Sequence, residues 1–167
     1  KPIVTLLIIL ALVVMVTMRV CRSATYAIHF AADKEIGYAV GSDNTVLLTI
    51  DGGFRWVRQD IPFSDVTFSS VFVKDKNVVF VVGARGTIYT TENGGKDWRR
   101  VATDAKDHFS SFKFTGADLK TGWITGTYGC ILKTIDGGLT WKPQTSGTSE
   151  NLLNIDLRDE SRAVAVG

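Results

Sequence analysis

Short runs of apolar and β-branched residues alternate with Gly, Asp, Asn and Lys turns through most of this chain. One stretch shows the order clearly, with runs at Ser69–Val73, Val78–Gly83, Gly86–Thr91 and Asp97–Val101. Runs of this length that are rich in Val, Ile, Phe, Tyr and Thr, and are bounded by turn residues, predict strands. The pattern therefore predicts a unit of four short antiparallel strands.

This unit recurs with a period of about 42 residues. The segments TIDGGFRW, TENGGKDW and TIDGGLTW end at Trp56, Trp98 and Trp141, which are 42 and 43 residues apart. A second marker, an apolar run closed by glycine, keeps the same period and ends at Gly41, Gly83, Gly126 and Gly167. Four strands in about 40–50 residues are typical of a β-propeller blade. The sequence predicts an all-β domain at residues 24–167, with three β-propeller-like blades and a partial fourth at residues 25–58, 68–101, 109–144 and 152–167.

The first residues follow a different pattern. The run IVTLLIILALVVMVTM at residues 3–18 is apolar on every side. Extended to residue 21, it would form a helix of about 28 Å, close to the ~30 Å hydrocarbon core of a bilayer. Lys1 precedes the run and Arg19 and Arg22 follow it, where cations can reach lipid headgroups. A signal peptide or a buried helix would share the apolar run. We favour a transmembrane anchor at residues 1–23 that contacts the lipid bilayer through residues 3–21.

Charge and cysteine content narrow the classes of function. The chain has 19 Lys and Arg against 17 Asp and Glu, and three of the cations lie in residues 1–22. The repeats therefore lack the basic excess of a nucleic-acid-binding surface. Cys21 and Cys130 alone do not indicate a disulfide framework. His29 and His108 have no further ligand at metal spacing, so we expect neither a metal nor a cofactor.

The segment that ends in each tryptophan resembles the Asp-box motif, Ser/Thr-x-Asp-x-Gly-x-Thr-Trp, which joins the third and fourth strands of a propeller blade. In this motif a carboxylate can accept backbone N–H groups across the turn, and glycine supplies positive φ. Asn93 replaces the aspartate of the second copy, and Arg55 and Asp97 replace the threonine before tryptophan. We interpret the motif residues as structural and not catalytic: Asp51, Gly53, Trp56, Asn93, Gly95, Trp98, Asp136, Gly138 and Trp141.

The longer segments VGARGTIYTTENGGKDW and TGTYGCILKTIDGGLTW resemble the photosystem II stability and assembly factor family of chloroplasts and cyanobacteria. The resemblance covers residues 25–167. It implies a non-catalytic scaffold or assembly subunit that binds an integral membrane protein complex, first of all a photosynthetic reaction centre or photosystem. The expected location is the inner or thylakoid membrane, with the bulk of the chain on the periplasmic or lumenal side. Because the family closes a seven-bladed ring, we expect further residues, a second copy or a partner to cover the strand at 163–167.

The rim opposite the Asp boxes is the predicted binding surface. It carries the turns between second and third strands, and loops on a rigid scaffold are where binding residues concentrate. The candidate partner-binding residues there are Asp43, Asn44, Arg85 and Tyr128. Arg85 lies in a G-x-R-G turn that resembles one in the assembly factor family. That family uses an arginine-bearing surface to hold membrane partners, so the resemblance implies a binding role for this residue. Two other functions stay open: a sialidase-like glycoside hydrolase, because such enzymes share Asp boxes, and an extracytoplasmic sensor domain.

Overall fold

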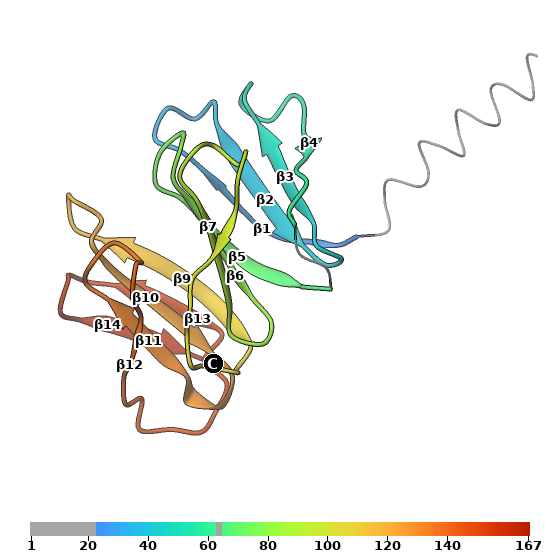
Figure 1. The fold of residues 1–167 in the computed structure, drawn as a ribbon. Helices are drawn as coiled ribbons and strands as arrows, with labels where there is room; N and C mark the ends of the chain where they lie inside the picture. The colour runs from blue at the N-terminus through green and yellow to red at the C-terminus, as the bar shows by residue number, and fades with distance from the viewer. Residues whose placement is uncertain (1–22, 63–64) are drawn as a thin grey trace, which may run out of the picture.

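Four antiparallel sheets follow one another along the chain in the computed structural model, which describes residues 23–62 and 65–167. Each of the first three sheets has four strands in chain order, and the last has two. Figure 1 shows the sheets stacked as successive blades, from blue through green and orange to red. The predicted all-β, blade-like architecture is confirmed. The predicted anchor at residues 3–21 lies outside the described residues, and among those described no helix is long and apolar enough to cross a membrane.

The strand bounds follow the sequence period. Blade 1 contains β1 (Thr25–Phe30), β2 (Gly37–Gly41), β3 (Val46–Thr49) and β4 (Val57–Arg58). Blade 2 contains β5 (Phe68–Val73), β6 (Val79–Gly83), β7 (Thr87–Thr91) and β8 (Arg99–Arg100). Blade 3 contains β9 (Phe109–Thr115), β10 (Thr121–Gly126), the turn η1 (Thr127–Gly129), β11 (Ile131–Thr134) and β12 (Lys142–Pro143). The half-blade contains β13 (Asn154–Leu157) and β14 (Ala163–Val166).

The fourth strands are shorter than the sequence predicts. The expected strand at Asp97–Val101 is only β8, because the turn before it extends through Trp98. The expected strand at Thr140–Gln144 is only β12 for the same reason. One further backbone bond, from the Val101 N–H to the Ile88 carbonyl oxygen at 2.9 Å, continues the contact between β8 and β7. The outer edge of each blade is therefore held by few backbone bonds.

The first strands of the blades, β1, β5, β9 and β13, lie next to one another. Hydrogen bonds tie them across blades, among them two that join the full blades. The Ser69 hydroxyl donates to the Phe109 carbonyl oxygen at 2.5 Å. The Val73 N–H donates to Nδ1 of His29 at 3.1 Å, and the imidazole lies 4.8 Å from the ring of Phe72. These strands form the side of the stack from which the blades radiate.

Two apolar clusters fill the junctions between the full blades. Successive side chains of a strand point to opposite faces of its sheet, so β6 serves both junctions. Val79 and Val81 join the cluster against blade 1, whereas Phe80 and Val82 join the cluster against blade 3. All five residues of β6 are buried. This double burial explains why the strand is a continuous apolar run without polar alternation.

Each junction between full blades places an aromatic residue of one second strand over the Asp-box glycine of the next blade. Tyr38 meets Trp98 edge to face at 6.3 Å, and a Cβ added to Gly95 would lie 3.1 Å from the Tyr38 hydroxyl. Phe80 holds the equivalent position one blade later, and a Cβ on Gly138 would lie 2.7 Å from its ring. Burial raises the pKa of Tyr38 to about 12, so its hydroxyl stays neutral.

The junction between blade 3 and the half-blade is built differently. Leu152 and Ile155 are buried there. The Ser111 hydroxyl donates to Oδ1 of Asn154 at 2.9 Å, and Nζ of Lys113 lies 2.7 Å from a carboxylate oxygen of Asp156. Exposed ion pairs add little to stability. The half-blade is attached partly by exposed polar contacts, and its residues belong to neither of the two apolar clusters.

Replacing Trp98 with Ala will destabilise the protein by about 3–5 kcal/mol, because the indole fills the junction between blades 1 and 2. The free energy of unfolding in urea measures the loss. Trp56 occupies the same Asp-box position in blade 1 but belongs to neither apolar cluster, so Trp56→Ala is the matched control and will cost less. Equal losses in the two variants would show that the inter-blade contact contributes nothing.

Unfolding stability will also fall as the pH drops below about 6.5. Burial, followed by the nearby charge of Lys34, lowers the pKa of His29 in the folded protein. The unfolded chain then binds the proton more tightly, so stability is fully present above the unfolded pKa and is lost as the pH falls towards the folded one. Urea midpoints at pH 7.5, 6.5 and 5.5 test this. His29→Gln, which keeps an acceptor but does not titrate, will flatten the profile; an unchanged profile would assign the pH dependence to other groups.

Candidate partner-binding site

The Asp box of blade 1 is a closed hydrogen-bonded turn. The Thr49 hydroxyl donates to Oδ1 of Asp51 at 2.8 Å and accepts the Gly53 N–H at 2.9 Å. The same carboxylate oxygen accepts the Arg55 N–H at 2.9 Å, and the Trp56 indole donates to the Gly53 carbonyl oxygen at 3.1 Å. The backbone hydrogen bond from Arg55, followed by that from the Thr49 side chain, lowers the pKa of Asp51. The Asp51 carboxylate therefore forms these hydrogen bonds within its own turn.

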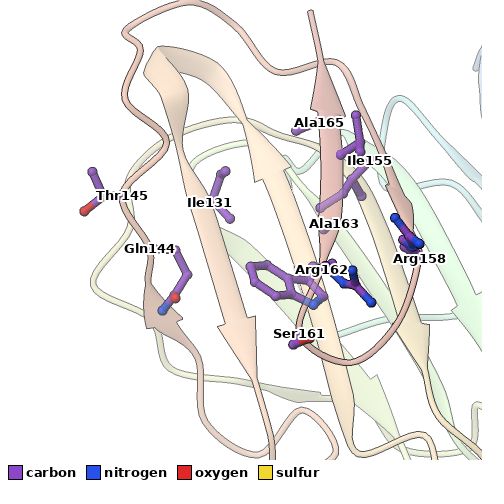
Figure 2. Close-up of a pocket in the computed structure, with 11 residues that line it drawn as sticks. Ile131, Gln144, Thr145, Ile155, Arg158, Ser161, Arg162, Ala163 and Ala165 are labelled. Carbon is purple, nitrogen blue, oxygen red and sulfur yellow. The ribbon is translucent and has the colours of Figure 1, made fainter.

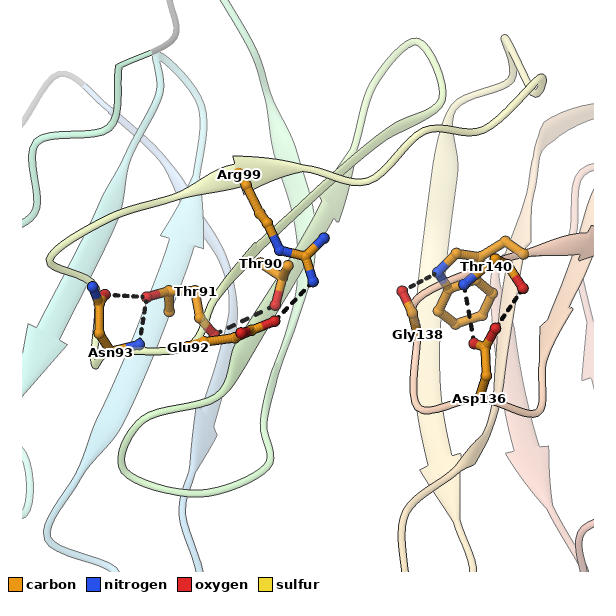
Figure 3. A network of polar contacts seen from close by, with 9 residues as sticks. Thr90, Thr91, Glu92, Asn93, Arg99, Asp136, Gly138 and Thr140 are labelled. Atoms are coloured by element: carbon orange, nitrogen blue, oxygen red, sulfur yellow. Dashed lines mark hydrogen bonds and ion pairs between the residues drawn. The ribbon is translucent and has the colours of Figure 1, made fainter.

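The third copy repeats this arrangement, and the second repeats it except for the indole bond, because the buried Trp98 N–H has no partner among the described residues. Figure 3 shows parts of the second and third copies. Oδ1 of Asn93 accepts the Asp97 N–H at 2.9 Å, so the amide supplies the acceptor that the carboxylate supplies elsewhere. In the third copy, Asp136 accepts from the backbone and hydroxyl of Thr140 at 3.0 and 2.5 Å. Burial alone would raise the pKa of Asp136, but the hydrogen bonds from Thr140 and from Thr134 lower it to about 2.

The opposite rim carries three equivalent turns between second and third strands. Their central pairs are Asp43–Asn44, Arg85–Gly86 and Tyr128–Gly129, and φ lies between 52° and 70° at all six residues. Positive φ at both central positions defines a type I′ turn, which suits the twist of a tight hairpin. The three turns therefore present their first central residue in the same way. That residue is Asp43 in blade 1, Arg85 in blade 2 and Tyr128 in blade 3.

The second residue of each turn fastens the crossing that leads to the next blade. The N–H groups of Asn44, Gly86 and Gly129 donate to the carbonyl oxygens of Val66, Asp107 and Glu150 at 2.9, 2.7 and 2.7 Å. The contact leaves no room for a side chain at Gly86, where a Cβ would lie 1.8 Å from the Ala105 oxygen. The second position is thus committed to structure, and the first position remains open to a partner.

The four predicted contact residues lie on these turns but differ in accessibility. Tyr128 is 76 % exposed, and Asp43 and Arg85 are also exposed. A guanidinium nitrogen of Arg85 donates to the Asp65 carbonyl oxygen, which orients the side chain along the rim. The side-chain oxygen of Asn44 is buried and has no partner among the described residues. Asn44 is therefore the least available of the four, and partner contact by the set stays a prediction.

A groove of about 520 Å³ lies between blade 3 and the half-blade, and sequence reasoning did not find it. Figure 2 shows Ile131 and Gln144 on the blade 3 side and Arg158 and Arg162 on the hairpin side. Trp123, which also lines it, holds the position of Tyr38 and Phe80 in the repeat. Its indole N–H is buried without a partner among the described residues. In the sequence, the alignment of WITG with YAVG and FVVG could have indicated that Trp123 lies at a junction between blades.

A smaller pocket of about 290 Å³ lies between the crossing at 103–107 and the outer strands of blade 3. Cys130, Asp104, Asp107, Trp141 and Pro143 are among its lining residues. Burial, and then the charge of Asp107, raises the pKa of the Cys130 thiol to about 11, so the thiol stays protonated. In the described ranges, no three His, Cys, Asp or Glu side chains lie together as a metal site would require.

Comparison with solved structures shows the same kind of fold. A structure of YCF48 bound to D1 peptide matches with a TM-score of 0.63 and 25 % identity, over 74 % of this chain and 42 % of that chain. YCF48 from Cyanidioschyzon merolae matches with a TM-score of 0.63 and 26 % identity, over 75 % of this chain and 41 % of that chain. The chain thus spans about two fifths of the length of these relatives.

A more distant match shows the fold alone. An ancestral GH74 enzyme has a TM-score of 0.63 and 15 % identity over 79 % of this chain and 20 % of its own. No curated protein sequence matches the chain. The model of one protein family, described as Photosynthesis system II assembly factor YCF48, matches residues 14–166. The chain therefore belongs to the YCF48 family of photosystem II assembly factors.

Proposed function

We propose that this protein is a non-catalytic photosystem assembly factor that binds an extended segment of a photosystem membrane protein at the rim opposite the Asp boxes. The observation that carries the proposal is family membership over residues 14–166, together with a relative of the same fold whose structure holds a D1 peptide. Family membership also favours binding over catalysis. The proposed partner is the D1 protein or a similar subunit.

The geometry of the rim supports this function. Arg85 and Tyr128 are exposed on rigid type I′ turns of adjacent blades. Arginine and tyrosine are enriched among residues that dominate binding energy. Because the turns are fastened to the crossings by backbone hydrogen bonds, these two side chains lose little backbone freedom on binding. A carboxylate of the bound segment would pair with Arg85, and an apolar residue would pack on Tyr128.

We further propose that residues 3–21 anchor the protein in the inner or thylakoid membrane, with the blades on the periplasmic or lumenal side. The uninterrupted apolar run and its flanking cations support the anchor. Such an anchor would hold the blades close to the exposed loops of an integral membrane subunit. Carbonate extraction of membranes, followed by protease treatment of sealed vesicles, tests both statements: the protein should stay with the lipid and be cut only from the proposed side.

The rim assignment is tested with solubilised photosystem complexes and a synthetic D1 peptide, captured by the full chain. Arg85→Asn and Tyr128→Asn will each weaken binding by about tenfold or more, as loss of an interface anchor does. Asparagine tolerates positive φ, so both turns will keep their shape. Phe54 is 92 % exposed on the Asp-box hairpin of the opposite rim, and Phe54→Ala will leave binding unchanged. Wild-type affinity in both rim variants would place the contact elsewhere.

A further inference from the structure

The smaller pocket lies between the two rim turns that carry Arg85 and Tyr128. One wall is the crossing at 103–107, which the Gly86 N–H holds through the Asp107 carbonyl oxygen at 2.7 Å. The other wall begins at Cys130, whose N–H donates to the Thr127 carbonyl oxygen at 3.1 Å. Both walls are therefore fixed by the same turns that form the rim. A partner seated on the rim would therefore lie next to this pocket.

The floor of the pocket is apolar. Leu132, Trp141, Pro143 and Ala105 contribute to it. The indole N–H of Trp141 already donates to the Gly138 carbonyl oxygen at 3.2 Å, so the ring offers its hydrocarbon surface and not a donor. A volume of about 290 Å³ is close to the lower end of the ~300–1,000 Å³ range of ligand pockets. This space suits a single long side chain better than a larger molecule.

Two carboxylates, those of Asp104 and Asp107, line the pocket and have no cationic partner in the part of the chain that the structure describes. The four ion pairs found among the described residues use the acids Glu92, Asp118, Asp156 and Asp159. The negative charge of Asp107 also acts on the Cys130 thiol and helps to raise its pKa. Lys106, between the two acids in sequence, is exposed and belongs to none of those ion pairs. The pocket thus combines an apolar floor with a negative potential.

We propose that this pocket binds an arginine side chain of the partner protein. The stem of the arginine would lie on Trp141 and Pro143, and its guanidinium would pair with Asp104 and Asp107. A planar guanidinium can serve two carboxylates at once and packs well on aromatic surfaces. The inference rests on the proposed function, because that function places a partner on this rim. It extends recognition to both signs of charge on the partner: Arg85 binds an acidic group, and the pocket binds a basic one.

The pocket is tested with butylguanidinium, which carries the stem and head of arginine, and with neutral butylurea of nearly the same shape. Both are titrated into the isotope-labelled full chain in detergent micelles, and NMR shifts are followed at the Trp141 indole and at the amides of Ala105 and Cys130. Butylguanidinium should give saturable shifts at these sites, and butylurea should bind at least tenfold more weakly. Equal effects of the two probes, or no saturable shift, would overturn the proposal.

The double variant Asp104→Asn, Asp107→Asn should reduce butylguanidinium affinity at least tenfold while leaving the urea midpoint near that of wild type. Glu150→Gln is the matched control, because the Glu150 carbonyl oxygen accepts the Gly129 N–H as that of Asp107 accepts the Gly86 N–H, but its side chain does not line the pocket. It should bind the probe like wild type. An unaffected double variant would show that the carboxylates are not the ligands.

A capture assay separates the failure of this inference from the failure of the proposed function. If the photosystem complex binds and the double variant binds it as tightly as wild type, the arginine pocket is wrong and the assembly function stands. If butylguanidinium binds as expected but neither the complex nor the D1 peptide does, the proposed partner is wrong and the pocket still accepts a guanidinium. Weaker capture by the double variant, with Glu150→Gln unaffected, supports both.

Discussion

The stack depends on one close contact, in which an aromatic ring of one blade rests on a glycine of the next. Gly138 has a φ of 90° and no Cβ, and a Cβ there would lie 2.7 Å from the Phe80 ring. The Asp-box hydrogen bonds hold this glycine in place, because Thr134 accepts its N–H while Asp136 fixes the rest of the turn. A motif whose hydrogen bonds lie within its own turn therefore determines how the full blades meet, and the apolar clusters form around that contact.

The two rims of the stack are fastened in different ways. On the Asp-box rim, the polar side chains of the motif are used within their own turns. On the opposite rim, backbone groups do the fastening: the Gly86 N–H holds the crossing through Asp107, and the Gly129 N–H holds the next through Glu150. The side chain of the first residue in each turn is exposed, although that of Arg85 also donates to the Asp65 carbonyl oxygen. This division explains how one repeated scaffold can present Arg85 in one blade and Tyr128 in the next without disturbing the packing below.

The sequence predicts what is local and repeated, and misses what depends on contact between blades. The spacing of Trp56, Trp98 and Trp141 predicts the blades, because each hairpin is specified within eight residues. The fourth strands were predicted too long, because Trp98 and Trp141 have high β propensity but are held at the Asp-box turn by packing in the apolar clusters. The arginine pocket could not be predicted from the sequence for another reason. Its acids precede Cys130 by more than twenty residues, and only the folding of the crossing onto blade 3 brings them together.

Stability is distributed unevenly along the stack, and the proposed binding surface lies where it is greatest. In repeat folds each unit is supported by its neighbours alone. At the junction of blades 2 and 3, the rings of Phe80 and Trp141 both contact those of Phe112 and Phe114. The last junction combines two buried aliphatic residues with exposed polar pairs. A guanidinium shared by two carboxylates needs both acids held in place, which a loosely packed junction would do less well. The crossing that carries them spans the aromatic junction, so the same packing that joins the blades also positions the acids.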